Sequence, residues 1–147
     1  MQIYSDSFEE NQHIPQKYSC DGRGISPLLR ITNVPGETVS LALIVDDPDA
    51  PGGTFNHWLV WNLPGDTKYI EEGKLPEEAR QGANSGGSTD YYPPCPPEGT
   101  HRYFFKVYAL DIRLNDLEVG ADRSRLEQAI DGHVLDQAEL IGLYSRE

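Results

Sequence analysis

The sequence predicts a mainly β fold, and three observations support this. Three segments have the apolar pattern of strands: 38–45 (TVSLALIV), 56–63 (NHWLVWNL) and 101–111 (HRYFFKVYALD). The chain also contains 14 glycines and 11 prolines, which is typical of a fold with many turns. The clearest helical pattern, at 123–130, is short. The length of 147 residues fits a single domain over residues 1–147.

The first of these segments is expected to be the central strand, because its residues are apolar on both faces. It is expected to stop at residues 46–53 (DDPDAPGG), since Pro48 and Pro51 lack the N–H donor that a ladder needs. The second segment is expected to end at the Pro-Gly-Asp turn that follows residue 63.

The C-terminal part of the chain predicts a short helix and a last strand. Residues 123–130 (RSRLEQAI) have a helical pattern, with Asp122 as the N-cap and Gly132 as the stop. A second helical turn is expected over 133–138, and a closing strand over 140–144.

The remaining segments are expected to be largely irregular. Short strands are predicted near 2–4 and 28–32, between glycines and prolines. Residues 66–100 form a long polar stretch with a proline cluster at 93–97. A loop of this length in a small domain is usually functional or disordered. No repeat and no linker divides the chain.

The composition is acidic, with 12 Lys and Arg against 24 Asp and Glu, so the formal net charge is −12. Such a surface repels nucleic acid and anionic membranes at long range, which argues against nucleic-acid binding. The plainest explanation is that the charge keeps the protein soluble. A local positive site for one small anion remains compatible with it.

Several features predict a cytoplasmic protein. The first residues, MQIYSDSFEENQHIP, contain neither the basic nor the apolar region of a signal peptide. No run approaches the roughly 18 apolar residues of a membrane span, so stable membrane insertion is not expected. Cys20 and Cys95 are therefore expected to be reduced thiols, although the sequence leaves a disulfide between them open.

Three clusters contain residues that could carry chemistry. The first is the loop at 46–51, which presents three closely spaced carboxylates and is stiffened by two prolines. One carboxylate is expected to orient a partner side chain. An ordinary solvated turn is the alternative, because Asp and Pro are common turn residues.

The second cluster lies at the start of the strand over 56–63. Alternation along the strand is expected to place Phe55, His57 and Leu59 on one face and Trp58 on the other. A single histidine at the end of an apolar strand is often a hydrogen-bonded core residue, and that alternative stays open for His57.

The third cluster is the segment 95–103, CPPEGTHRY. His101 and Tyr103 are two positions apart on one strand, so both side chains are expected to face the same side. Two imidazoles and a phenol, with a carboxylate to hold one imidazole, would form a cradle for phosphate or carboxylate. Backbone N–H groups near Gly99 could add donors.

Common catalytic and cofactor motifs are absent from the sequence. It contains no GxSxG, P-loop, GxGxxG, HExxH or CxxC pattern. Asp47, His57 and His101 are residue types that can ligate zinc, but no two of them have the spacing of a metal motif. No metal and no cofactor are therefore predicted.

Several segments resemble the phosphatidylethanolamine-binding protein (PEBP) family, and in particular its bacterial and archaeal, Raf-kinase-inhibitor-like branch. The similar segments are DPDAP at 47–51, NHWLVWN at 56–62, PCPPEGTHRYFFKVYALD at 94–111, CDG at 20–22 and HVLDQAEL at 133–140. The resemblance extends over nearly the whole chain. It implies a PEBP-like fold, a sandwich of two antiparallel β-sheets with a few short helices. It also implies a small pocket that binds phosphate-type anions, including a phospholipid headgroup.

The same resemblance implies a set of ligand-binding residues: Asp47, His57, Cys95, Pro96, Pro97, His101 and Tyr103. Asp49 and Pro51 are implied as supports of the loop. One departure stands out, because relatives usually have Tyr-Gly-Gly-Pro where this chain has Tyr-Tyr-Pro-Pro at 91–94. The wall of the pocket is therefore expected to be reshaped at Tyr92 and Pro93.

Three functions are compatible with these features. The favoured one is a non-enzymatic protein that binds a small anion or a phospholipid headgroup. The second is a protein-interaction module that modulates a kinase or another protein, with the partner unknown. The third is a hydrolase, for which the sequence offers a base but no clear nucleophile. The resemblance also suggests a homodimer.

Overall fold

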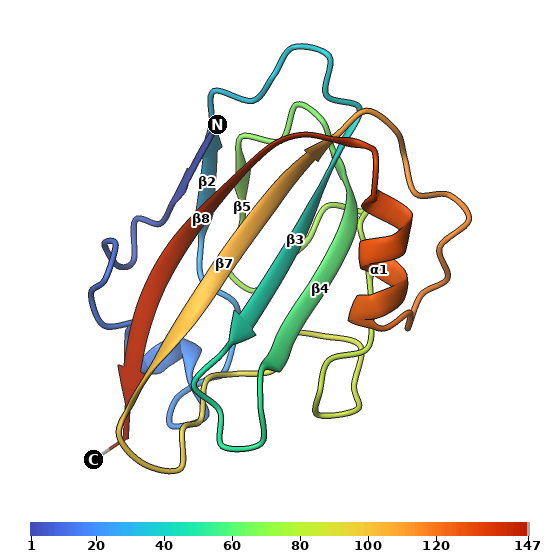
Figure 1. Cartoon of the computed structure of the whole chain (residues 1–147). Coiled ribbons are helices and arrows are strands. Elements are labelled where there is room, and N and C mark those ends of the chain that lie inside the picture. The colour runs from blue at the N-terminus through green and yellow to red at the C-terminus, as the bar shows by residue number, and fades with distance from the viewer. Residues whose placement is uncertain (147) are drawn as a thin grey trace.

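The structure is a computed structural model of the chain, and it describes residues 1–146. Its strands form two antiparallel sheets (Figure 1). The larger sheet has the order β6 (Arg80–Gln81), β4 (Phe55–Pro64), β3 (Ser40–Asp47), β7 (Thr100–Leu110) and β8 (Val134–Ser145). The smaller sheet has the order β1 (Gln2–Tyr4), β2 (Leu29–Thr32) and β5 (Tyr69–Ile70). The helical elements are the 3-10 turn η1 (Gln16–Tyr18) and the helix α1 (Arg123–Ile130).

The predicted mainly β fold is confirmed, and β3 is the central strand of the larger sheet. All eight residues of β3 are buried, because the sheet is covered on both faces. The strand continues further than predicted, to Asp47, where residues 46–53 were expected to interrupt it. Asp46 pairs with Asn56 and Asp47 with Phe55, so the ladder ends only at Pro48.

The helix α1 has the predicted bounds and the predicted cap. The Asp122 carboxylate accepts a hydrogen bond from the backbone N–H of Arg125 at 3.0 Å. Gly132 follows the helix with a φ of 81°, a conformation that glycine adopts without a steric penalty.

The predicted helical turn over 133–138 is wrong. Residues 134–138 belong to β8, which pairs with β7 along the length of β7 and also contains the strand expected over 140–144. Val107 pairs with Ala138, for example, and Ala109 with Asp136. The long β7 edge offers more hydrogen bonds than a short isolated helical turn could form, so tertiary pairing overrides the local pattern.

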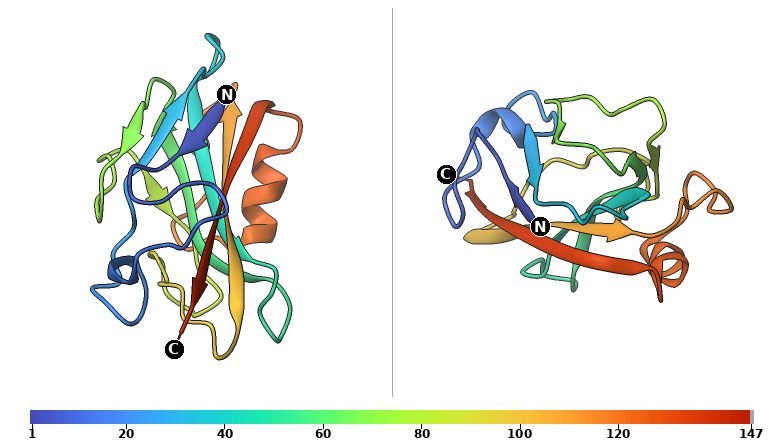
Figure 2. Two further views of the ribbon diagram at one scale, coloured as in Figure 1. Left: turned by 90° about the vertical axis from the view of Figure 1, so that its left-hand side faces the viewer. Right: turned by 90° about the horizontal axis from the view of Figure 1, so that it is seen from above.

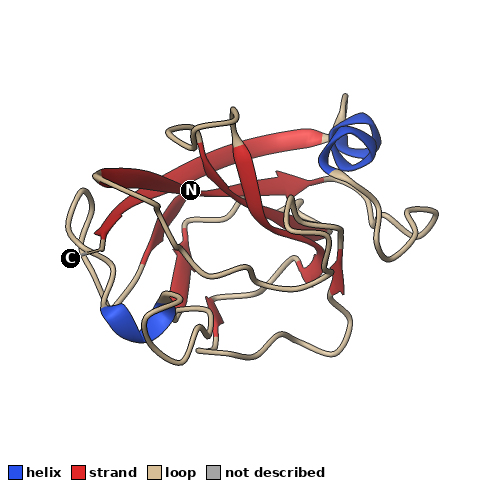
Figure 3. Ribbon diagram, turned by 90° about the horizontal axis from the view of Figure 1, so that it is seen from below, coloured by secondary structure: helices blue, strands red, loops and turns tan. Residues whose placement is uncertain are grey.

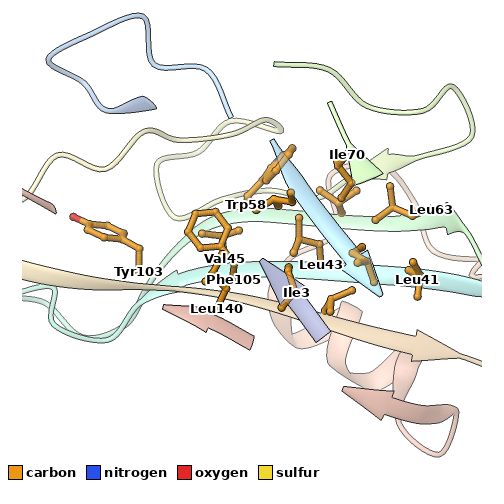
Figure 4. Close-up of a cluster of buried hydrophobic side chains, with 14 of the residues drawn as sticks. Ile3, Leu41, Leu43, Val45, Trp58, Leu63, Ile70, Tyr103, Phe105 and Leu140 are labelled. Carbon is orange, nitrogen blue, oxygen red and sulfur yellow. The ribbon is translucent and has the colours of Figure 1, made fainter. Parts of the chain in front are cut away.

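Two apolar clusters lie on opposite faces of the larger sheet. Figure 2 shows α1 on one face and the smaller sheet on the other. The main cluster lies between the two sheets and includes Leu43, Trp58 and Phe105 (Figure 4). The second cluster lies under α1 and includes Leu59 and Leu126. Among residues 1–146, no helix has the combination of length and apolar character that crossing a membrane requires.

Candidate functional site

A cavity of about 280 Å³ opens at the end of the molecule where the β3–β4 loop meets the segment before β7. Figure 3 looks at the molecule from this end. We call it the histidine cavity. It is lined by Asp47, Ala50, Pro51, Phe55, His57, Tyr92, Cys95, Pro96, Pro97, His101 and Tyr103. The seven residues expected to bind a ligand all belong to this lining, together with Pro51. Asp49 is not part of the lining.

A β-bulge in β4 positions His57. Val45 of β3 pairs with Trp58, and the next residue, Asp46, pairs with Asn56. His57 is therefore an extra residue that has no partner across the ladder. A bulge of this kind redirects a side chain locally and is common beside functional sites.

Phe55 and His57 share a face, as expected, but the bulge makes the expected alternation wrong beyond His57. Leu59 packs under α1, whereas Trp58 packs between the two sheets. His57 faces the histidine cavity together with Phe55, on the same side of the sheet as Trp58. Period-two reasoning assumes a regular ladder, and one inserted residue reverses the faces beyond it.

The His57 ring is buried, with 4% of its surface exposed, and its proton position is defined by its partner. Its Nδ1 lies 2.7 Å from the carbonyl oxygen of Tyr92. A carbonyl oxygen can only accept, so Nδ1 carries the proton. Burial lowers the pKa of His57 below the usual value for histidine, and the bond to Tyr92 opposes this only in part. The neutral ring therefore leaves Nε2 without a proton.

His101 is held in a similar way by a carboxylate. Its Nδ1 donates to Oδ2 of Asp47 at 2.7 Å, and both residues are buried. The other oxygen of Asp47 accepts from the backbone N–H of Asp49 at 2.8 Å. Because both carboxylate oxygens are engaged, the Asp47 side chain has a fixed orientation and fixes the imidazole in turn.

The Nε2 atoms of the two histidines remain available to a ligand. Among the residues that the structure describes, the only ring hydrogen bonds of His57 and His101 are those at Nδ1. Among residues 1–146, the buried side-chain polar atoms that lack a hydrogen-bond partner are Thr38 Oγ1 and Trp61 Nε1. Neither histidine Nε2 is among them, so both Nε2 atoms are accessible to solvent. The histidine cavity thus contains two imidazole nitrogens that no protein group occupies.

Tyr103 lies beside both imidazoles, on the same strand face as His101, as its position predicted. Its ring meets His57 edge to face, with the centroids 5.2 Å apart, and lies nearly parallel to His101 at 6.5 Å. Figure 4 shows Tyr103 at one end of the main cluster, with its hydroxyl pointing away from the other side chains. Burial and the charge of Asp47 raise the pKa of Tyr103 well above its ordinary value, so the hydroxyl keeps its proton.

The three carboxylates of the Asp-rich loop have separate partners, which differs from the solvated turn that the sequence left open. Asp46 faces the α1 side of the sheet, where its Oδ2 binds Lys106 at 2.9 Å and Arg123 at 2.7 Å. Asp47 faces the histidine cavity and holds His101. Successive side chains point to opposite faces of a strand, so Asp46 and Asp47 contact different partners on the two faces of the sheet.

Asp49 ties the β3–β4 loop to β7. Its carboxylate accepts from the backbone N–H of Arg102 at 2.9 Å and from the guanidinium through Nε at 2.9 Å and Nη2 at 2.8 Å. Through these bonds it anchors the loop that carries Ala50 and Pro51 to the cavity. The Arg102 hydrogen bonds lower the pKa of Asp49 to about 2.

Asp49→Asn should lower the free energy of unfolding by about 1 kcal/mol at pH 7, since the ion pair is partly exposed to solvent. The folded-state pKa of Asp49 is depressed, so its contribution is complete above the unfolded value near 4 and is lost as the pH falls towards 2. Urea unfolding at pH 7, 4 and 2.5 should show the wild-type and variant curves converging. Asp66→Asn, at an exposed position, is the control, and a difference that is as large at pH 2.5 as at pH 7 would contradict the assignment.

The wall formed by Cys95, Pro96 and Pro97 is covalently anchored. Cys20 and Cys95 form a disulfide, so the expectation of reduced thiols is wrong in this structure. The backbone N–H of Cys20 also donates to the carbonyl of Pro94 at 3.0 Å. Residues 75 positions apart in the sequence lie side by side here, a proximity that local sequence patterns do not reveal.

Two aromatic residues of the lining were not predicted as site residues. Phe55 and Tyr92 pack against each other with ring centroids 5.1 Å apart, and both lie near the His57 ring. The departure from the family pattern at 91–94 was the one signal that pointed to Tyr92, and the structure places its side chain in the lining. Phe55 precedes the bulge, and the signal that could have marked it was its predicted position on the same strand face as His57.

Possible metal ligands do not converge in the part of the chain that the structure describes. No group of three or more His, Cys, Asp or Glu residues is arranged to hold a metal ion there. Cys95 is bonded to Cys20, and Asp47 is occupied by His101 and the Asp49 N–H. In the part of the cavity lined by His57, His101 and Tyr103, the side-chain polar atoms left for a ligand are the two Nε2 atoms and the Tyr103 hydroxyl.

A family model described as phosphatidylethanolamine-binding protein matches residues 4–145, almost the entire chain. The chain belongs to the phosphatidylethanolamine-binding protein family. A UPF0098 protein from Methanothermobacter thermautotrophicus is 49% identical to it and the match covers 99% of both chains. A UPF0098 protein from Aquifex aeolicus is 46% identical, over 100% of this chain and 90% of its own.

Solved PEBP structures have the same fold. A PEBP homologue from Chlamydia trachomatis matches with a TM-score of 0.95 at 44% identity, over 99% of this chain and 97% of its own. E. coli YbcL, described as a member of the mammalian PEBP family, matches with a TM-score of 0.92 at 29% identity, over 99% and 98% of the two chains. The family resemblance inferred from the sequence and the PEBP fold are both confirmed.

Proposed function

We propose that this chain is a non-enzymatic binding protein whose histidine cavity holds a small phosphate-type anion, including the phosphate of a phospholipid headgroup. One observation carries the proposal. Two imidazoles are fixed through Nδ1, one by a backbone carbonyl and one by a carboxylate, and both keep Nε2 free beside the same cavity. Histidine pairs of this kind can become cationic donors at a pH near neutrality, which suits recognition of phosphate.

Anion binding at this site should take up protons. The neutral ring of His57 presents Nε2 as an acceptor, so a phosphate oxygen can be bound there only when a proton lies between the two atoms. That proton comes from solution or from a protonated ligand. Since burial lowers the pKa of the free His57 ring and a bound anion raises it, affinity should increase as the pH falls between these two values.

Titration with inorganic phosphate, followed by NMR of the histidine rings, tests the proposal. The signals of His57 and His101 should shift and saturate, while those of His13 and His133, which lie outside the cavity, should not. Phosphate should bind about tenfold or more tightly at pH 6 than at pH 8, as expected for a linked proton. His101→Gln should weaken binding, and His133→Gln should not. Cavity signals that stay unchanged at tens of millimolar phosphate would refute the proposal.

A binding role is proposed ahead of a hydrolytic one because of the side chains in the cavity. Covalent hydrolysis requires an activated nucleophile. The described lining contains neither serine nor threonine, its one cysteine is bonded to Cys20, and its one phenolic hydroxyl that faces both imidazoles, on Tyr103, has a raised pKa. The absence of turnover with a panel of phosphate and carboxylate esters is the expected result.

Three further expectations stay proposals: a cytoplasmic location, a homodimer, and an unidentified protein partner such as a kinase. The disulfide argues against the cytoplasmic location, because disulfides persist mainly in oxidising compartments. Cell fractionation and sedimentation would test location and dimerisation. Pull-down with wild type and with His101→Ala would show whether a protein partner depends on the cavity.

A further inference from the structure

The histidine cavity is larger and less polar than a bare phosphate ion requires. Its volume of about 280 Å³ is roughly nine times the share of liquid volume that one water occupies. The free polar groups converge on the part lined by His57, His101 and Tyr103. The rest is apolar, and consists of Ala50, Pro51, Phe55, Tyr92, Pro96 and Pro97. A ligand that fills this space therefore carries an apolar group beside its anion.

Within the apolar part, contacts with neighbouring residues hold the Tyr92 ring in one position. A Cβ atom at Gly86 would lie only 2.3 Å from the ring carbon Cε2 of Tyr92, so the ring rests directly on the backbone of Gly86. On another side it packs against Phe55 at 5.1 Å and approaches His57 at 5.8 Å. The position of the ring is thus set before any ligand arrives.

The turn that carries Gly86 is itself held by a buried side chain. Asn84 is 5% exposed, and its Oδ1 accepts from the N–H of Gly86 at 2.9 Å and of Ser88 at 3.2 Å. Its Nδ2 donates to the carbonyl of Asp90 at 2.8 Å. A loop fixed by three such bonds keeps the glycine, and with it the ring of Tyr92, in place.

Two parts of Tyr92 have separable roles. The backbone carbonyl accepts from His57 and so belongs to the anion site, whatever the side chain is. The side chain makes its contacts through the ring. Its hydroxyl has no hydrogen-bond partner in the described residues, and the residue is 37% exposed at the mouth of the cavity. Substitution of the side chain can therefore change the mouth without removing the carbonyl.

We propose that Tyr92 is a specificity-determining residue, which makes the histidine cavity prefer phosphate monoesters with a flat apolar substituent over small esters. This rests on the proposed anion site. The phosphate lies against His57 and His101, and the substituent lies against the partly exposed rings of Phe55 and Tyr92. Aromatic contacts of this kind strengthen binding beyond simple area burial.

Methyl phosphate and phenyl phosphate form a matched pair of probes, since both are monoesters and only one carries a ring. Calorimetry at pH 6 should show phenyl phosphate binding about tenfold more tightly to the wild type and to Tyr92→Phe. In Tyr92→Ala the ratio of the two affinities should fall to about two or less. Gly86→Ala should also reduce the ratio, because the new Cβ displaces the ring.

The outcomes separate this inference from the anion site on which it rests. Equal affinity of the wild type for the two esters, or an unchanged ratio in Tyr92→Ala, would overturn the role of Tyr92 and leave the anion site standing. If the wild type binds neither ester nor inorganic phosphate, both proposals are wrong. Circular dichroism of Tyr92→Ala and Gly86→Ala establishes that the variants are folded.

Discussion

Removal of the disulfide between Cys20 and Cys95 should lower the free energy of unfolding by about 4 kcal/mol. The bond joins residues 75 positions apart, and closing a loop of that length removes much of the conformational freedom of the unfolded chain. The backbone bond from Cys20 to Pro94 survives in the variants, so the folded wall loses only one of its attachments. The double variant Cys20→Ser/Cys95→Ser should therefore fold with a lower midpoint in guanidinium.

Two comparisons make this result decisive. The wild type in a dithiol reductant should unfold at nearly the same denaturant concentration as the double variant, and reductant should not affect the variant. A thiol reagent should find no free thiol in the denatured, non-reduced wild type. Wild-type unfolding that is insensitive to the reductant would show that the two cysteines do not stabilise the fold as a pair.

Phe105→Ala should destabilise the fold by about 3–5 kcal/mol, the usual cost of truncating a fully buried phenylalanine. The Phe105 side chain has no exposed surface, lies between the two sheets, and packs against Phe8 with the ring centroids 5.7 Å apart. Neither backbone pairing nor charge changes, so the loss comes from the cavity and from the apolar contacts that the ring makes.

The neighbouring residue provides the control. Phe104 points to the opposite face of β7, where it is partly exposed beneath Arg102 and Lys106. Phe104→Ala should cost only about 1 kcal/mol, because less of its surface is buried and its contacts with the two cations are exposed. Urea unfolding of both variants measures the difference. Similar losses at the two positions would contradict the burial pattern of β7.

The strands were predictable where apolar patterning and ladder geometry agree. The central position of β3 follows from residues that are apolar on both faces, and α1 follows from its cap at Asp122 and its stop at Gly132. The strand β8 was predicted only in its second half. Its first half, VLDQAE, is largely exposed and has no regular alternation of apolar and polar residues, so the pairing with β7 decides its conformation.

The site was predictable in membership but not in geometry. Family resemblance indicated Asp47, His57 and His101 as site residues, and the structure brings them into one cavity. The bulge that turns His57 to that side arises from the register between β3 and β4, which periodicity within a single strand cannot show. Phe55 and Tyr92 join the lining through contacts between distant segments.

By itself, the sequence determined the mainly β class, the central strand, the helix with its caps, and the family. These depend on local patterning and on motifs, and both can be read along the chain. Only the tertiary structure decided that Cys20 meets Cys95, which nitrogen of each imidazole remains free, and that the ring of Tyr92 rests on Gly86. The physical reason is that each of these depends on groups far apart in sequence, whose distances are set by how the sheets and loops pack.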